Sequence, residues 1–286
     1  MNQGYTYTER IQKATLLLDY LCSQYDHSTR AQWEQRLRDG ELSLDGRPVE
    51  QDQLLRPGQR LSWCRPPWEE PEVPQFERII YEDEALIAID KPSGLPTAPA
   101  GGFLEHTLLM QLRKQVPGAV PMHRLGRATS GIVLFTRTEA TAALVQRAWR
   151  DGQVQKRYCA LLDGVPPWER RHITHPIGPV PHPLLGSVFA ASPVGKPAST
   201  QVLSIDKSRD QARAEIEIHT GRPHQIRIHM AAEGYPLWGD PLYGPGGLPS
   251  SAALPGDPGY YLHARTLHLQ HPTRLEPLYL TCEAPF

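Results

Sequence analysis

The sequence has little of what marks several common protein classes. Its four cysteines, Cys22, Cys64, Cys159 and Cys282, lie far apart and form no CxxC pair, which argues against a zinc site or a disulfide framework. No apolar run approaches the roughly 20 residues that span a bilayer. The first residues, MNQGYTYTER, have neither the basic region nor the apolar core of a secretory signal. We therefore expect a cytoplasmic protein with no membrane contact.

Sequence motifs for several cofactors are also missing. There is no GxGxxG after a first strand and no GxxxxGK[ST], so a nucleotide cofactor is not expected. No paired-carboxylate signature of a glycosidase stands out. His224 and His229 are five residues apart and lack the carboxylate company of a metal site, so we predict no metal ion.

The net charge of the chain is close to zero. The formal net charge is −1, and residues 1–74, with nine basic and twelve acidic residues, carry −3, which leaves +2 for the remainder. A polyanion partner would therefore depend on a local basic cleft and not on a global field.

Apolar residues make up 40% of the 286 residues, which is enough for a packed core, and 29 prolines and 23 glycines predict many turns.

The first 64 residues predict a small separate module. Leu17, Leu18 and Leu21 have helical spacing, and Ser28 or Thr29 is a candidate cap for a second helix with Trp33 and Leu37 on its buried face. Asp45-Gly46 is a hairpin signal. We expect a small N-terminal domain (1–64), a proline-rich linker (65–77) and a larger domain (78–286).

The larger domain has many expected strands in non-alternating order and few helices. This pattern predicts an α+β fold with a mixed, mostly antiparallel sheet. The stretch PHQIRIHMAAEG (223–234) is predicted to begin as a strand and to run into a helix that Gly234 ends.

Five segments of this domain resemble one family in order and spacing. They are DEALIAIDKPSGLP (83–96), HRLGRATSGIVLFTRT (123–138), KRYCALLDG (156–164), HTGRPHQIRIHMAAEGYPLWGDPLYG (219–244) and LHARTLHLQHP (262–272). Together they resemble the RNA pseudouridine synthase family of the RluA type, and the N-terminal module resembles an S4-like RNA-binding domain. The resemblance implies a pseudouridine synthase fold and an isomerase, an intramolecular transferase without metal or organic cofactor, that acts on ribosomal or transfer RNA. A monomer is the default expectation for the oligomeric state.

In such a reaction the uridine is flipped out of the RNA stack, its N-glycosidic bond is broken, and the uracil is turned and rejoined through carbon. By resemblance, Tyr158 packs on the uracil and moves a proton, Arg227 pairs with the catalytic aspartate, Ile228 forms the apolar wall beside the base, and Arg124 fills the gap that the base leaves. The same resemblance places further RNA contacts at His123, Arg127, Thr129 and Ser130 in the large domain and at Arg30, Arg36 and Arg38 in the small one.

One position departs from this family. Gly126 stands where the family's aspartate attacks the sugar or removes its proton, and a glycine can do neither. Loss of a catalytic nucleophile removes several powers of ten of rate. Three readings stay open: an RNA-binding relative without turnover, a replacement carboxylate such as Asp90 or Asp240, or a subgroup that works by another route.

Electrostatics constrains these readings. A buried Arg227 without a carboxylate partner would cost several kcal/mol. We therefore expect Arg227 to contact a different carboxylate or to face a wet, exposed pocket. If the pocket is otherwise intact, Gly126→Asp is expected to create or raise pseudouridine formation.

Overall fold

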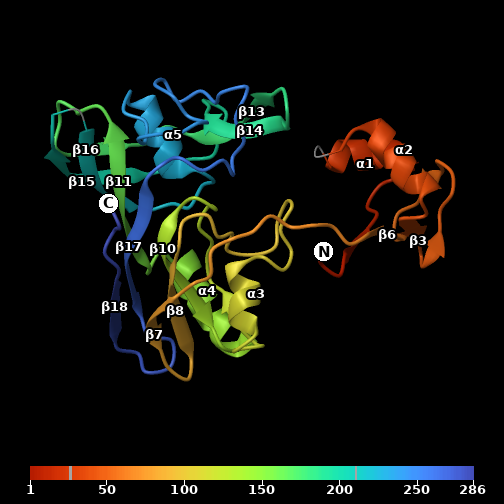
Figure 1. Ribbon diagram of the computed structural model, residues 1–286, viewed down its shortest axis with the longest axis horizontal. Helices are drawn as coiled ribbons and strands as arrows, with labels where there is room; N and C mark the ends of the chain where they lie inside the picture. The colour runs from red at the N-terminus through yellow and green to blue at the C-terminus, as the bar shows by residue number, and fades with distance from the viewer. Residues whose placement is uncertain (26–27, 210) are drawn as a thin grey trace. The chain divides into compact units, whose positions relative to one another are not determined.

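The computed structural model describes residues 1–25, 28–209 and 211–286. The chain forms two compact units, Met1–Glu70 and Pro71–Phe286 (Figure 1). Within the described residues, no helix has the length and apolar character needed to cross a membrane.

The first unit is a pair of helices with short strands. The helices are α1 (Leu17–Gln24) and α2 (Arg30–Arg38), and the strands are β1 (Tyr5–Arg10), β2 (Thr15–Leu16), β3 (Leu42–Leu44), β4 (Arg47–Pro48), β5 (Leu54–Leu55) and β6 (Arg60–Arg65). A four-stranded sheet has the order β1-β6-β3-β4, and β2 pairs with β5. The expected helix pair and hairpin are confirmed, whereas β1 was not predicted.

Local signals explain where α2 and the hairpin begin and end. Thr29 caps α2 through a reciprocal capping box with Gln32, and Gly40, with a φ of 74°, follows its C-terminal end. Asp45 and Gly46 both have positive φ, as a tight two-residue hairpin turn between β3 and β4 requires.

The second unit is built on a large sheet. Its helices are α3 (Leu108–Arg113), α4 (Glu139–Arg150) and α5 (Gln225–Ala232). Its strands are β7 (Arg78–Glu82), β8 (Leu86–Lys91), β9 (Val120–Pro121), β10 (Ser130–Thr136), β11 (Gln155–Asp163), β12 (Arg171–Ile173), β13 (Ile177–His182), β14 (Gly186–Ala191), β15 (Thr200–Lys207), β16 (Gln211–Ile218), β17 (Leu262–Gln270) and β18 (Pro277–Thr281).

The sheet confirms the predicted class. In the part of the chain that is described it has ten strands, with the main order β12-β15-β16-β11-β17-β10-β8-β7, while β9 pairs with β10 and β18 with β17. The pairing of β10 with β17 is parallel and its other pairings are antiparallel. The hairpin of β13 and β14, within a proline-rich stretch, was not predicted.

The prediction of a strand at the start of residues 223–234 is wrong. Helix α5 covers Gln225–Ala232, begins after His224 in the left-handed conformation, and is followed by Gly234 with a φ of 88°. The alternation Ile-Arg-Ile-His resembles a half-buried strand, but α5 is buried almost all round, so alternation did not report an exposed face.

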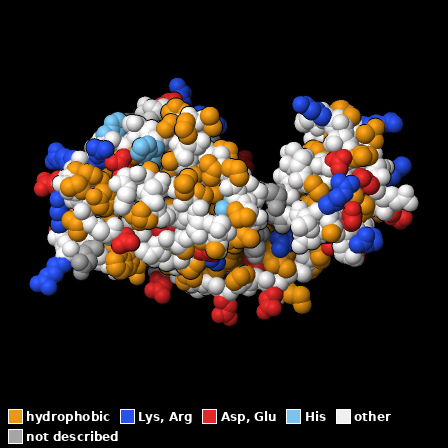
Figure 2. Space-filling view, turned by 90° about the horizontal axis from the view of Figure 1, so that it is seen from above, with side chains coloured by type: hydrophobic (Ala, Val, Ile, Leu, Met, Phe, Trp, Pro, Cys, Tyr) orange, Lys and Arg blue, Asp and Glu red, His pale blue; other side chains and the backbone are white. Residues whose placement is uncertain are grey.

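Charge is dispersed on the surface that Figure 2 presents. Lys and Arg side chains are scattered there among hydrophobic and acidic ones instead of gathering into one field. This distribution agrees with the small net charge of the sequence.

Candidate active site

A pocket of about 110 Å³ lies in the second unit, between the loop before β10 and the start of α5. Strands β11 and β17 supply further walls. The residues that line it are Arg124, Leu125, Gly126, Thr129, Tyr158, Ile218, Arg222, His224, Gln225, Ile226, Arg227, Tyr260 and Leu262. We call residues 224–227 the helix wall, and residues 124–129 together with Tyr260 the loop wall.

The helix wall contains a buried ion pair. Nε and Nη2 of Arg227 donate to the two carboxylate oxygens of Asp240, both at 2.7 Å, and neither side chain is more than 2% exposed. The backbone N–H groups of Leu242 and Tyr243 donate to the same carboxylate. Burial lowers the pKa of Arg227, but the Asp240 carboxylate outweighs it and leaves that pKa above its usual value. The expectation that Arg227 contacts a different carboxylate is confirmed.

His224 introduces a neutral imidazole at the N-terminus of α5. Burial, with the nearby Arg227 charge, lowers its pKa to about 4. The hydroxyl of Tyr243 donates to the carbonyl of Phe189, so Nδ1 of His224 donates to that hydroxyl, at 2.9 Å, and Nε2 remains an acceptor. Its φ of 54° is strained for a residue with a side chain, a feature that clusters at functional sites.

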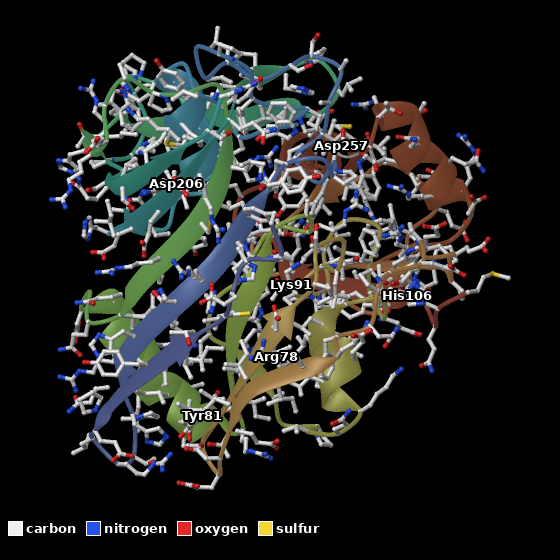
Figure 3. The ribbon with its side chains drawn as sticks, turned by 60° about the vertical axis from the view of Figure 1, so that its left-hand side comes forward. Arg78, Tyr81, Lys91, His106, Asp206 and Asp257 are labelled. Carbon is white, nitrogen blue, oxygen red and sulfur yellow. The ribbon has the colours of Figure 1, made fainter. Side chains whose placement is uncertain are left out.

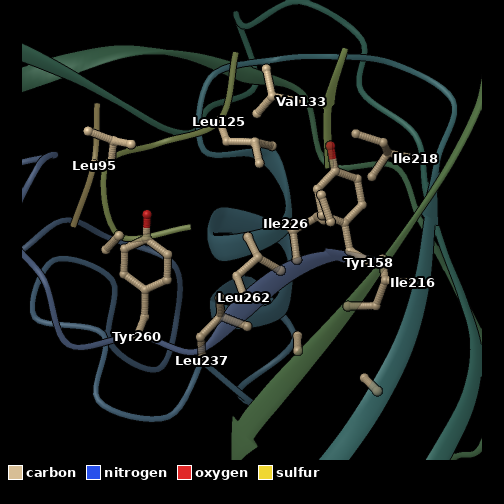
Figure 4. Close-up of a cluster of buried hydrophobic side chains, with 14 of the residues drawn as sticks. Leu95, Leu125, Val133, Tyr158, Ile216, Ile218, Ile226, Leu237, Tyr260 and Leu262 are labelled. Atoms are coloured by element: carbon tan, nitrogen blue, oxygen red, sulfur yellow. The ribbon is translucent and has the colours of Figure 1, made fainter. Parts of the chain in front are cut away.

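Two tyrosines stand on either side of the apolar floor of the pocket. Tyr158 comes from β11 and Tyr260 lies two residues before the start of β17, with Ile226 and Leu262 between them and both hydroxyls pointing the same way (Figure 4). The pairing of β11 with β17 shifts register at Tyr158, and such irregularities re-aim a side chain. Burial raises the pKa of Tyr158 to about 12, so its hydroxyl is protonated near neutral pH. An aromatic face with a protonated hydroxyl suits stacking on a base.

Hydrogen bonds from Lys91 and from the turn after β8 fix the backbone of the loop wall. Lys91, at the end of that strand (Figure 3), donates through Nζ to the carbonyls of Pro92, Leu95 and Arg127. Oγ1 of Thr97 both donates to the carbonyl of Leu125 and accepts from its N–H. The motif KPSGLPT therefore fixes the backbone on which residue 126 stands.

The structure brings together only part of the predicted site. Arg124, Gly126, Thr129, Tyr158 and Arg227 line the pocket. The remaining large-domain candidates, His123, Arg127, Ser130 and Ile228, are not among the lining residues.

These four make other contacts. Nε2 of His123 accepts from the N–H of Leu134, and its ring stacks on Trp149. Arg127 donates to the carbonyl of Gly256, and Ser130 donates to Nδ1 of His263, whose Nε2 donates to the carbonyl of Cys282.

Ile228 is fully buried in a separate apolar cluster, and Ile226 lines the pocket instead. In a strand, residues two apart share a face, whereas in a helix they point in nearly opposite directions. Because this segment is the helix α5, Ile226 and not Ile228 faces the pocket.

No carboxylate lines the pocket within the described residues 1–25, 28–209 and 211–286. Asp240 lies behind Arg227 and is engaged by four hydrogen bonds. Asp90 interacts with the thiol of Cys282 instead. Neither carboxylate therefore lines the pocket beside Gly126.

Tyr260, Arg222 and Gln225 are pocket residues that the sequence did not single out. Gln225 is recognisable in hindsight from its place in the TGRPHQIR motif, where it accepts from the hydroxyl of Thr220 and the N–H of Arg222. Tyr260 gives no such signal, because it lies outside the five motifs and 131 residues from its partner Thr129.

Known proteins resemble this chain in sequence and in fold. A model of the RNA pseudouridylate synthase family matches residues 85–232. An uncharacterized RNA pseudouridine synthase of Synechocystis sp. is 42% identical over 273 residues, which cover 94% of this chain and 94% of that protein. The chain belongs to the RNA pseudouridylate synthase family.

Other members confirm the extent of the likeness. Ribosomal large subunit pseudouridine synthase D of Pseudomonas aeruginosa is 33% identical over 271 residues, 88% of this chain and 82% of that protein. The structure of Human RNA Pseudouridylate Synthase Domain Containing 1 matches with a TM-score of 0.59 at 26% identity, over 77% of this chain and 87% of that one. The second unit thus has the pseudouridine synthase fold.

Proposed function

We propose that this chain isomerises uridine to pseudouridine in RNA and that the described pocket receives the flipped uridine. The observation that carries the proposal is the pocket itself, which unites Arg124, Tyr158 and Arg227 from three separate motifs. The Tyr158 ring offers a face for the uracil. Arg124 and Arg222 at the pocket offer charge to the RNA phosphates, which supplies affinity without sequence readout.

Ribosomal or transfer RNA is the proposed partner. Ribosomal RNA is favoured, because one relative with high coverage is named a ribosomal large subunit enzyme. For the first unit we propose an S4-like role, with Arg30 and Arg38 at the RNA phosphates. Both are exposed, although Arg30 also pairs with Asp19.

Arg36 is placed differently from these two arginines. Its guanidinium lies 4.4 Å from the ring centroid of Trp33 and 4.5 Å from that of Trp63, and it donates to Ser28. A guanidinium held against aromatic faces is oriented before a partner arrives. We therefore propose that Arg36 contacts RNA from a fixed position.

A second candidate function is RNA binding without turnover in the same pocket. The observation that favours it is the lack of a carboxylate among the described residues that line the pocket. Binding would need only the aromatic face and the arginines, whereas isomerisation also needs a group that assists cleavage of the glycosidic bond.

Nucleoside mass spectrometry of RNA from a deletion strain of the source organism distinguishes the two. Loss of at least one pseudouridine, restored by the native gene but not by a Tyr158→Ala gene, supports isomerisation. Full pseudouridine content in the deletion strain, together with retained RNA binding by the purified chain, supports the second function and contradicts the first.

A further inference from the structure

Gly126 is explained by a neighbouring side chain and not by its own backbone. Its φ is outside the left-handed region that favours glycine. A Cβ built on Gly126 would lie 2.9 Å from the hydroxyl oxygen of Tyr260 and 3.4 Å from Oγ1 of Thr129. The first distance is shorter than real Cβ contacts allow, so the Tyr260 hydroxyl occupies the space in which a side chain at 126 would begin.

Tyr260 is held firmly in that space. Its hydroxyl hydrogen-bonds Oγ1 of Thr129 at 3.1 Å, and the guanidinium carbon of Arg227 lies 4.1 Å from its ring centroid. The side chain is only 6% exposed. Tyr260 therefore links its own loop wall to Arg227 of the helix wall and cannot move aside without breaking a buried hydrogen bond and a ring contact.

We propose that Tyr260 takes the place of the absent carboxylate and that its hydroxyl hydrogen-bonds the ribose of the bound uridine. The identity of the ligand rests on the proposed function, and the ribose is assigned to residue 126 because the family resemblance has the aspartate that acts on the sugar at that position. A phenol hydroxyl can both donate and accept, so it can serve a ribose hydroxyl while it keeps its bond to Thr129. Tyr260 is thereby a substrate-contacting residue in a pocket without a carboxylate.

The pairing of Gly126 with Tyr260 is tested by a double-mutant cycle of Gly126→Ala and Tyr260→Phe. We expect Gly126→Ala to lower Tm by roughly 2–4 °C in the native chain, as about 1 kcal/mol does in a domain of this size, and by much less in a chain that already carries Tyr260→Phe. Gly221→Ala is the matched control, since a Cβ there meets nothing within 4 Å. Additive shifts in Tm would overturn the pairing.

The contact with ribose is tested by NMR titration with uridine 5′-monophosphate. Tyr260→Phe is expected to weaken binding roughly fivefold, the effect of one neutral hydrogen bond. Tyr261→Phe, which alters the adjacent and 42% exposed tyrosine, should leave binding unchanged. Equal affinities of the two variants overturn the contact. If the native chain itself does not bind the nucleotide, the proposed function fails with the contact, and the cycle still decides the pairing.

This geometry revises what Gly126→Asp should do. Alone, the aspartate meets the Tyr260 hydroxyl. Combined with Tyr260→Phe, it gains room for its Cβ, so the double variant should form more pseudouridine in RNA than Gly126→Asp does. Equal yields would contradict the obstruction, and Gly126→Asn with Tyr260→Phe controls for the carboxylate charge.

Discussion

The two walls of the pocket meet the same ligand space but are stabilised in different ways. On the helix wall, Arg227 has its carboxylate in Asp240, a residue of the same structural region. On the loop wall, hydrogen bonds from Lys91 and Thr97 fix the backbone, and Tyr260 closes the space at Gly126. The helix wall therefore does not depend electrostatically on residue 126. A glycine there removes a reactive group without leaving a buried charge unpaired.

The largest expected effect comes from breaking the helix wall. Asp240→Ala leaves the Arg227 guanidinium buried without its carboxylate, and we expect a loss of about 3–5 kcal/mol in the free energy of unfolding, measured with urea. Asp206→Ala, on an exposed position of β15, is the control and should stay within about 0.5 kcal/mol. Similar losses in both variants would mean that the ion pair does not hold the wall.

Much of the helix wall could be predicted from the sequence. The cost of an unpaired buried charge limited Arg227 to two predicted environments, another carboxylate or a wet, exposed pocket, and the structure has the first. The caps of α2 and the turn at Asp45-Gly46 were also predictable, because these signals act over a few residues. The large mixed sheet followed from the order of strand-like segments.

The loop wall could be predicted only in part. Gly126 was visible as an anomaly, but its cause is Tyr260, which the fold brings back from 131 residues beyond Thr129. No periodicity or turn signal reports such a contact. Helix α5 was misread for a related reason, since burial on all sides erases the polar face that distinguishes a helix from a strand.

The next largest effect should come from a glycine in β10, just after the loop wall. Gly131 has a φ of 104°, and a Cβ there would lie 2.4 Å from the carbonyl oxygen of Ala264 in the parallel neighbour β17. We expect Gly131→Ala to cost about 2–4 kcal/mol, against about 1 kcal/mol for Gly126→Ala, because backbone cannot yield as a side chain can. Thermal and urea unfolding of both variants measure the difference, and a reversed order would contradict the distinction between them.

A smaller effect is expected where the turn holds the loop. Thr97→Val preserves shape but leaves the buried N–H and carbonyl of Leu125 without the Thr97 hydroxyl, which should cost about 1–2 kcal/mol. Ser93→Ala removes one bond, to the carbonyl of Ala128, at an exposed residue and should cost about 0.5 kcal/mol. Equal costs in urea unfolding would show that burial of these bonds does not matter here.

At neutral pH the smallest effect is expected at His123, which precedes the loop wall and contacts it from outside the pocket; the effect grows as pH falls. Burial, with the nearby charge of Lys156, lowers the pKa of His123 to about 3, and its Nε2 accepts from the N–H of Leu134. Because the unfolded chain binds this proton near pH 6.5 and the folded chain does not, stability is lost as pH falls from about 6.5 toward 3.

The variant His123→Gln keeps a side-chain acceptor that does not titrate. We therefore expect the native chain to lose free energy of unfolding relative to this variant between pH 7 and pH 4, by less than about 1.4 kcal/mol per pH unit, the limit for one proton. Urea unfolding across this range measures the difference, with Gln at the exposed His172 as the control for the substitution itself. Parallel pH profiles would mean that the proton is taken up equally by the folded chain, and that His123 is not the buried acceptor that joins the loop wall to β10.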